Sequence, residues 1–377
     1  MIRPTFAEIS LPAIRENISK LKKLVHADSF FCPMVKADGY GHGAMEVVQS
    51  IEEVGCFTVG VSLVEEGVEL RSRGWAGEIY VYGVYPSTST KVIAEHGMKP
   101  VLSRWEQLDA LEKFPETEFH LKIDTGMNRL GFESDDIEKL CYRIQEKGMR
   151  LTGVCTHLAI GEDADQDDGF TSEQVKTFRM AADYLQSKFE NNLVEHVYNT
   201  AGLVQNYKKT GAPARYGCRP GGGIYGLMPA LGLGNGDLDL SPAFHLRSEI
   251  VHIQKLQPGE STSYGLTWTS NKPSVVGIVP IGYADGYPRS LSNRGRVLVQ
   301  SREVPVVGNV CMDFLMIDLT IVPEAQQIGN PVTLIGRDES GVVLRAEYLA
   351  QSVHSVSYEL VCRIGPRVPR QYLGVSL

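Results

Sequence analysis

Residues 33–43 read Pro33-Met34-Val35-Lys36-Ala37-Asp38-Gly39-Tyr40-Gly41-His42-Gly43, and an apolar run that begins at Phe30 leads into them. An apolar run that breaks into glycines predicts a buried strand followed by a loop whose backbone can approach a ligand closely. Lys36 stands at the end of that strand. Desolvation there lowers the pKa of an amine and makes it a nucleophile that can form a Schiff base. A lone lysine at a strand end more often extends to solvent, so the interpretation depends on the rest of the chain.

Short apolar runs recur along the first part of the chain, each followed by a turn signal and an amphipathic stretch. The eight predicted strands are Phe30–Val35, Phe57–Val61, Glu78–Gly83, Lys99–Leu102, Glu118–Ile123, Leu151–Thr156, His196–Asn199 and Arg215–Arg219. Helices are expected after the N-cap Ser10 and over Leu63–Arg73, Arg104–Lys113, Asp135–Lys147 and Ser172–Phe189. Eight alternations favour an α/β fold, namely a (β/α)8 barrel of the TIM type. A doubly wound open sheet is the alternative, and the count of eight disfavours it.

The pattern changes after the glycine-rich stretch 232–236, where helical periodicity nearly disappears. Strands separated by Gly, Pro and Asn turns are expected over Leu246–Gln254, Ser274–Ile281, Arg296–Val299, Val304–Val307, Phe314–Leu319 and Pro331–Ile335. A chain of 377 residues is also too long for one ordinary core. We therefore expect a barrel domain over 1–235, whose first few residues can pair with the second domain, and a mainly β domain over 236–377.

The composition narrows the classes of function. Hydrophobic residues make up 43% of the chain and charged residues 22%, and the net charge of −8 comes with no basic stripe. This balance argues against nucleic acid and anionic membranes as partners. No apolar run approaches the roughly 20 residues that span a bilayer, and the first residues lack the pattern of a secretory signal. Because the seven cysteines are scattered with no C-x-x-C pair, we expect reduced thiols and a cytoplasmic protein.

The ends of the predicted strands carry residues suited to chemistry. In barrels of this type the carboxyl ends of the strands surround the active site. These ends are Lys36, Lys122 to Arg129, Thr156-His157, His196 with Asn199 and Thr200, and Arg219 followed by glycines 221–223. Taken alone, Arg129 would be a surface charge and His157 a structural histidine, but five such ends meet at one mouth.

The glycine run suggests a phosphate site. Its backbone N–H groups, together with the Thr200 hydroxyl, can hold a phosphate, although neither a Walker nor a dinucleotide pattern is present. A phosphate site beside a reactive lysine suggests pyridoxal phosphate (PLP) held as a Schiff base. No His, Cys or Asp cluster has the spacing of metal ligands, so no metal is expected.

Several segments match one known family, in order, along both expected domains. They are residues 35–43, residues 122–131, Thr156-His157, Arg219-Pro220-Gly221, Ser263-Tyr264-Gly265, residues 282–287, Cys311-Met312-Asp313 and Tyr358-Glu359. With these segments the chain resembles the alanine racemases, the PLP enzymes of fold type III, along nearly its whole length. Two positions depart from the family pattern: Thr200 stands where serine is common, and Gly222 stands where a larger apolar residue is usual.

The resemblance implies a catalytic pair and a cofactor site. Lys36 is expected to bind PLP and to act as one base, and Tyr264 is expected to act as the second base from the partner subunit of a homodimer with shared active sites. Arg219 is expected at the pyridine nitrogen, and His157 is expected to link Arg219 to Tyr264. The implied cofactor-binding set is Lys36, Tyr40, His157, Asn199, Thr200, Arg219, Gly221, Gly222 and Tyr358.

The resemblance also implies a substrate site and supporting positions. Arg129 and the Met312 backbone are expected to bind the substrate carboxylate. Lys122 matches a lysine that is often carbamylated in the family, and the new negative charge would orient Arg129. The other implied supporting positions are His196 behind Arg219, Tyr283 at the entrance, and Cys311 and Asp313 beside Met312.

The implied activity is PLP-dependent interconversion of L-alanine and D-alanine by two bases, which would supply D-alanine for cell-wall peptidoglycan. Three alternatives share parts of this pattern. A fold-type III decarboxylase would carry a glutamate at the position of Arg219. A non-catalytic PLP carrier would lack the second domain with Tyr264. A racemase for serine, lysine or a broad range of amino acids would share the whole pattern, and only the absence of an export signal argues against it.

Overall fold

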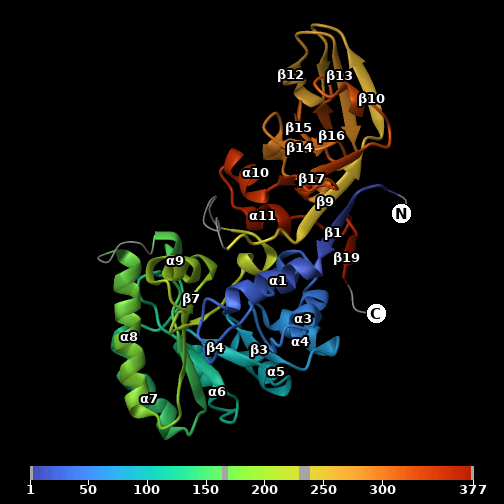
Figure 1. Ribbon diagram of the computed structural model, residues 1–377. Helices are drawn as coiled ribbons and strands as arrows, with labels where there is room; N and C mark the ends of the chain where they lie inside the picture. The colour runs from blue at the N-terminus through green and yellow to red at the C-terminus, as the bar shows by residue number, and fades with distance from the viewer. Residues whose placement is uncertain (1–2, 164–168, 229–237, 375–377) are drawn as a thin grey trace.

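The computed structural model describes residues 3–163, 169–228 and 238–374, which form two lobes (Figure 1). The lower lobe is a barrel of parallel strands with helices on its outside, and the upper lobe is mainly β. Within the described residues, no helix is both long and apolar enough to cross a membrane. The glycine-rich stretch 232–236, and with it the expected domain boundary between residues 235 and 236, lies outside the described residues.

Seven parallel strands build the barrel in the order β2-β3-β4-β5-β6-β7-β8. Their bounds are Thr58–Val61, Glu78–Val81, Lys99–Leu102, Phe119–Lys122, Leu151–Cys155, Val194–Tyr198 and Gly217–Cys218. The helices of this lobe are α1 (Leu11–Lys22), α2 (Lys36–Tyr40), α3 (Ala44–Glu52), α4 (Val64–Ser72), α5 (Thr90–Glu95), α6 (Trp105–Leu111), α7 (Ile137–Glu146), α8 (Phe170–Lys188) and α9 (Thr200–Thr210). The predicted α/β barrel is therefore confirmed, with strands that are mostly shorter than the sequence indicated.

The first predicted strand, Phe30–Val35, is not a regular strand. It makes one isolated parallel bridge from Phe31 to β8 and another from Met34 to β2. Pro33 lies between the two bridges and has no N–H group, so a continuous ladder cannot form. The segment nevertheless occupies the eighth position and joins the two edges of the sheet.

Helix α1 shows how local sequence sets the start of the barrel lobe. Ser10 caps the helix, and its hydroxyl accepts a hydrogen bond from Ala13 N at 3.3 Å. Ile14, Ile18 and Leu21 are fully buried, at the helical spacing that the sequence predicted. The N-cap prediction at Ser10 is confirmed.

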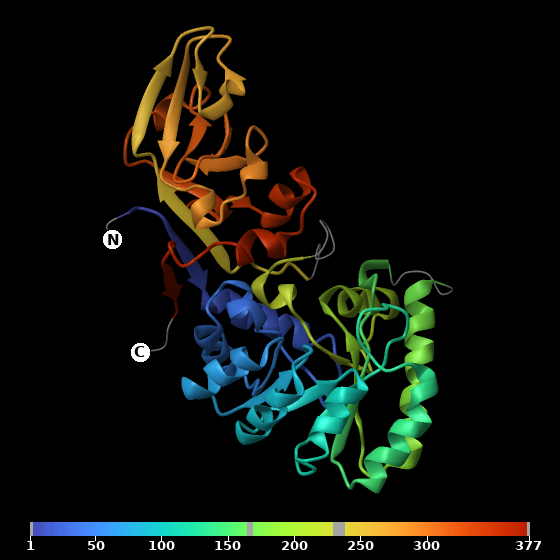
Figure 2. The ribbon, with the colours of Figure 1, turned by 180° about the vertical axis from the view of Figure 1, so that it is seen from behind.

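The upper lobe consists of three antiparallel or mixed sheets. The largest has the order β15-β14-β17-β9-β1-β19, with β18 paired to β17, and two smaller sheets have the orders β10-β13-β16 and β11-β12. The bounds are β1 Phe6–Ser10, β9 Phe244–Glu249, β10 His252–Leu256, β11 Ser261–Thr262, β12 Trp268–Thr269, β13 Ser274–Val279, β14 Arg296–Val299, β15 Arg302–Pro305, β16 Leu315–Asp318, β17 Pro331–Arg337, β18 Val343–Leu344 and β19 Arg370–Leu373. Strand β1, at the start of the chain, lies between β9 and β19 of this lobe, as Figures 1 and 2 show.

The sequence predicted one strand over Leu246–Gln254, and the structure has two. Strand β9 belongs to the large sheet, whereas β10 belongs to the sheet with β13 and β16. At the break, Ile250 N donates to Asn330 O and Val251 N donates to Ile278 O, so the chain passes from one sheet to the other. Two helices that the sequence did not predict, α10 (Ala346–Ser352) and α11 (Ser357–Cys362), lie between the lobes (Figure 1).

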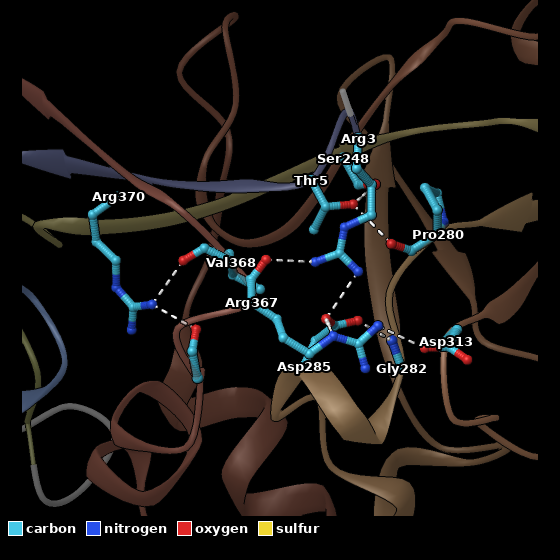
Figure 3. Close-up of polar contacts among 11 residues, drawn as sticks. Arg3, Thr5, Ser248, Pro280, Gly282, Asp285, Asp313, Arg367, Val368 and Arg370 are labelled. Atoms are coloured by element: carbon cyan, nitrogen blue, oxygen red, sulfur yellow. Dashed lines mark hydrogen bonds and ion pairs between the residues drawn. The ribbon is translucent and has the colours of Figure 1, made fainter. Parts of the chain in front are cut away.

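A network of ion pairs joins residues near both ends of the chain to two loops of the upper lobe (Figure 3). The side chain of Asp285 is fully buried, and its Oδ1 lies 2.9 Å from Arg3 Nη1 and 3.4 Å from Arg367 Nε. Its Oδ2 accepts a hydrogen bond from Gly282 N at 3.0 Å. Arg367 Nη2 also lies 2.7 Å from Asp313 Oδ1. The loops 282–286 and 311–313 are thereby linked to the segments that lead into β1 and β19.

Replacing Asp285 by alanine should leave two arginines without their buried partner. We expect Asp285→Ala to lower the free energy of unfolding by about 2 kcal/mol, less than for a fully buried pair because both arginines can regain water. Asp313→Ala, which removes the half-exposed carboxylate on the same arginine, should cost less than about 1 kcal/mol. Urea denaturation of both variants measures the difference, and equal losses would contradict the central role of Asp285.

Candidate functional site

A cavity of about 520 Å³ opens at the carboxyl ends of the barrel strands, beneath helix α11. It brings together most of the residues that the sequence predicted for the site. From that set the lining contains Lys36, Tyr40, Lys122, Arg129, His157, Asn199, Thr200, Arg219, Gly221, Gly222 and Tyr358. Residues outside that predicted set line it as well: Met34, Ser62, Tyr82, Gly83, Val84, Leu130, Cys155, Thr156, Glu162 and Ala201.

Lys36 begins a left-handed turn of backbone. Ala37, Asp38, Gly39 and Tyr40 have φ of 53°, 52°, 60° and 54°. For non-glycine residues this region costs roughly 1–2 kcal/mol each. The turn is closed by its own hydrogen bonds, from Gly39 N to Val35 O at 2.8 Å and from Gly41 N to Ala37 O at 2.9 Å. Strain of this kind often accompanies function, and here it directly follows the predicted reactive lysine.

The Lys36 amine is half-buried among other cationic groups. Burial lowers its pKa, and the Arg129 guanidinium lowers it further. Burial also lowers the pKa of Lys122. Two amines in one cavity are therefore easier to deprotonate than lysines in water, which is the state that a nucleophile or a base needs.

The glycines after β8 form a cradle with no room for side chains. A Cβ on Gly221 would overlap the Tyr40 hydroxyl, and a Cβ on Gly222 would overlap the Tyr358 ring. Gly223 N donates to Thr200 Oγ1 at 3.3 Å. Thr200 is also the first residue of α9, so the helix N-terminus faces the same cavity. A larger residue at 222 would therefore meet the Tyr358 ring and the Leu227 carbonyl in this arrangement.

Arg219 is a buried cation whose guanidinium donates several hydrogen bonds. Nη1 donates to His196 O at 2.9 Å and contacts His196 Nδ1 at 2.7 Å. Nη2 donates to Thr156 O at 2.5 Å and lies 3.3 Å from His157 Nδ1. These contacts place the rings of His196 and His157 next to the Arg219 guanidinium.

A third histidine, His120, extends this network and was not predicted from the sequence. His120 Nδ1 lies 2.8 Å from His196 Nε2. Because Arg219 can only donate, His196 Nδ1 must accept, so Nε2 carries the hydrogen and donates to His120. Burial lowers the pKa of His120 to about 3 and that of His196 well below its usual value, so both rings are neutral. His120 stands two residues before Lys122 on β5, and this alternation was the available signal.

The loop that carries Arg129 is shaped by Asp124. Its Oδ1 accepts from Gly126 N at 2.9 Å and from Asn128 N at 3.1 Å, and its Oδ2 accepts from Arg129 N at 3.1 Å. This turn holds Arg129 at the rim of the cavity, on the same side as Lys122.

Five predicted site residues lie elsewhere in the described part of the chain. Tyr264, Tyr283, Cys311, Met312 and Asp313 belong to the upper lobe and do not line the cavity. Their loops are linked, since Tyr283 N donates to Cys311 O at 3.0 Å and Asn309 Nδ2 donates to Tyr264 O at 2.7 Å. Together with nearby residues they form an exposed patch, here called the loop patch, in which the exposed fractions are Tyr264 75%, Leu266 67%, Met312 52%, Phe314 45% and Tyr283 42%.

Comparison with known proteins identifies the family. The family model described as "Alanine racemase, N-terminal domain" matches residues 9–229, and that described as "Alanine racemase, C-terminal domain" matches residues 243–372. The alanine racemase of Geobacter sulfurreducens is 36% identical and covers 100% of this chain and 98% of its own length. That of Halothermothrix orenii is 34% identical and covers 98% of this chain and 97% of its own length.

Solved structures agree with the sequence matches. The crystal structure of alanine racemase from D-cycloserine-producing Streptomyces lavendulae has a TM-score of 0.90 and 29% identity, covering 99% of this chain and 98% of that one. Both domains and the complete chain are therefore accounted for by one family. The chain belongs to the alanine racemase family, the PLP-dependent isomerases of fold type III.

Proposed function

We propose that this protein interconverts L-alanine and D-alanine with PLP bound in the barrel cavity. The observation that carries the proposal is the meeting of Lys36, Arg219 and the Gly221–Gly223 cradle in one cavity of a chain from the alanine racemase family. Supply of D-alanine for cell-wall peptidoglycan in the cytoplasm is the role that fits this reaction.

The residues of the cavity fit PLP. The backbone at Gly221 and Gly222 leaves space where side chains would collide, and the N-terminus of α9 favours a phosphate there. Tyr40 and Tyr358 flank the same space and keep their protons, because burial raises the pKa of both phenols. Asn199 caps α9 through Gly202 N at 2.8 Å and so fixes the phosphate end of the site. Lys36 would hold the cofactor covalently, and Arg219 would face its ring nitrogen.

Racemisation needs a proton acceptor on each face of the substrate Cα. When bound, PLP withdraws electrons from the amino acid and makes the Cα–H acidic. Lys36 would take or return the proton on one face, since its lowered pKa supplies a free amine. Tyr264 of the partner subunit would do the same on the other face, with His157 linking it to Arg219. The two proposed bases are therefore Lys36 in the barrel and Tyr264 in the upper lobe.

Arg219 would decide which reaction follows. A guanidinium remains protonated and accepts no hydrogen bond. Arg219 would therefore only donate to a ring nitrogen placed beside it and would not protonate it, which would favour proton return to Cα over side reactions such as transamination. A decarboxylase would need a carboxylate at this position.

The substrate carboxylate would bind to Arg129 and to the Met312 backbone of the partner subunit. Arg129 is exposed at the rim and needs an anionic neighbour to orient it. Lys122, which is 8% exposed and has a lowered pKa, could react with carbon dioxide and supply that charge as a carbamate.

A homodimer would complete the site. The loop patch exposes large apolar side chains together with two residues that the proposal assigns to catalysis and substrate binding. Apolar patches of this kind mark interaction surfaces. A second copy of the chain, placed so that each loop patch covers the other copy's cavity, would bury the patch and close both sites.

The first prediction concerns substrate and cofactor. The purified protein should be yellow, and borohydride followed by peptide mass spectrometry should find the pyridoxyl group on Lys36. In a panel of alanine, serine and lysine enantiomers read by chiral chromatography, alanine should have the highest kcat/KM. Lys36→Ala should lose roughly 1,000-fold or more, because cofactor attachment and one base disappear together. Label on another lysine, preference for another amino acid, or release of carbon dioxide would contradict the proposal.

The second prediction concerns the dimer. Phe314→Glu places a charge in the loop patch and should raise the dimer dissociation constant by about tenfold or more, as expected for an anchor residue in an interface. Ile328→Glu adds the same charge at an exposed residue outside the patch, in the loop before β17, and should leave the constant unchanged. Sedimentation velocity over a range of concentrations measures both. A wild-type protein that stays monomeric, or equal behaviour of the two variants, would exclude this dimer.

A further inference from the structure

The carboxylate of Glu66 binds three backbone N–H groups from two separate segments of the barrel mouth. Its Oε1 accepts from Ala37 N at 2.6 Å, and its Oε2 accepts from Ser62 N at 2.8 Å and from Leu63 N at 2.9 Å. Hydrogen bonds to a charged acceptor are roughly twice as strong as neutral ones. One side chain at the start of α4 therefore ties the loop after β2 to the residue that follows Lys36.

The bond to Ala37 acts on a particular peptide unit. The Ala37 N–H and the Lys36 carbonyl belong to the same rigid plane, so turning that plane would change ψ of Lys36 and φ of Ala37 together. Ala37 has a φ of 53°, in the left-handed region that an alanine avoids when nothing holds it there. The bonds from Gly39 N to Val35 O and from Gly41 N to Ala37 O close the turn around these residues, but neither engages the Ala37 N–H itself. The contact with Glu66 fixes its first peptide.

We propose that Glu66 is the positioning residue for Lys36. Its hydrogen bond from the Ala37 N–H stabilises the left-handed turn that directs the lysine side chain into the cavity. Glu66 is not among the described residues that line the cavity. It therefore acts through the backbone rather than by touching substrate or cofactor. This inference rests on the proposed function, in which Lys36 is the cofactor-binding residue and a base.

The same carboxylate influences the charge of the amine. Glu66 raises the pKa of Lys36, whereas burial and Arg129 lower it. The other described ionisable groups that face the amine or share its cavity are Cys362 on α11, His157 after β6, Lys122 on β5, Arg219 after β8, Cys155, Glu162, Tyr40, Tyr82 and Tyr358. Loss of the negative charge at Glu66 should therefore lower the pKa of Lys36 and leave more free amine at low pH.

Two substitutions at Glu66 separate the effect of side-chain length from the effect of charge. Glu66→Asp keeps the negative charge at the start of α4, but its side chain is one methylene shorter and cannot hold both the Ala37 N–H and the α4 cap. Glu66→Gln keeps the length and loses the charge, and only one of its two terminal atoms can accept hydrogen bonds. Glu65→Gln is the matched control, because it removes the same charge from the neighbouring, exposed position of the same helix.

The expected results differ between the variants. Both Glu66 variants should lower kcat by about tenfold or more with KM changed less than about twofold, since misplacing a reacting group by 1 Å can cost roughly 100-fold. The acid limb of the pH profile of kcat/KM should move to lower pH in Glu66→Gln and stay in place in Glu66→Asp. Glu65→Gln should show neither effect. A role confined to capping α4 would change the melting temperature without moving the acid limb.

A second readout does not depend on turnover. Full-length protein stripped of cofactor is mixed with PLP, and the rate at which the borohydride-fixed adduct forms on Lys36 is followed by mass spectrometry. At a pH where the Lys36 amine is free in every variant, the rate should fall in both Glu66 variants and not in Glu65→Gln. A folded Glu66→Asp with wild-type kcat, or with the wild-type capture rate, would overturn the proposal. If the wild type captures PLP but racemises no amino acid, the proposed function fails while the capture rates still test Glu66.

Discussion

The guanidinium of Arg219 is a buried charge, and the geometry of the barrel mouth depends on satisfying it. Its nitrogens reach the carbonyl of Thr156, directly after β6, the carbonyls of His196 and Val197 in β7, and the ring of His196. A buried cation that lacks partners is strongly destabilising, so these strand ends are fixed in relation to β8. The glycines that follow β8 are thereby held beside Thr200, in the same cavity as Lys36.

This constraint also orders the hydrogen bonds behind the site. Arg219 sets the tautomer of His196, and His196 in turn sets the tautomer of His120. Burial lowers the pKa of both rings and keeps them neutral at physiological pH, so neither adds a positive charge beside Arg219. The proposed choice of reaction, in which a permanently protonated group faces the cofactor ring, needs a charge that its neighbours cannot neutralise.

Segments from both ends of the chain form part of the upper lobe, and they help to fix the loops of the loop patch. Strand β1 inserts between β9 and β19, and Arg3 and Arg367 meet at Asp285. The loops with Tyr283 and Met312 are therefore fixed before any second copy binds. Tyr264, the most exposed aromatic of the loop patch at 75%, lies on a neighbouring loop, where its carbonyl accepts a hydrogen bond from Asn309 Nδ2. A surface prepared in this way fits the proposed role of completing the site of another copy.

Much of this arrangement could be predicted from the sequence, because periodicity and strand-end chemistry are local signals. The runs that became β2 to β8 and the cap at Ser10 could be recognised from neighbours a few residues away. The break between β9 and β10 could not, since it depends on Asn330 and Ile278, far along the chain. The role of Glu66 could not be predicted for the same reason. A glutamate in the first turn of a helix is common, and its hydrogen bond from Ala37 N spans 29 positions.

The central claim is that Lys36 from one copy and Tyr264 from another form one active site. Lys36→Ala and Tyr264→Phe should each be nearly inactive alone. After dissociation and random reassociation, about half of the dimers are hybrid, and one site of each hybrid carries no lesion, so activity should return to about a quarter of wild type. If both residues acted within one chain, every site would keep one lesion. No recovery, after subunit exchange has been demonstrated, would contradict the shared site and place Tyr264 in the active site of its own chain.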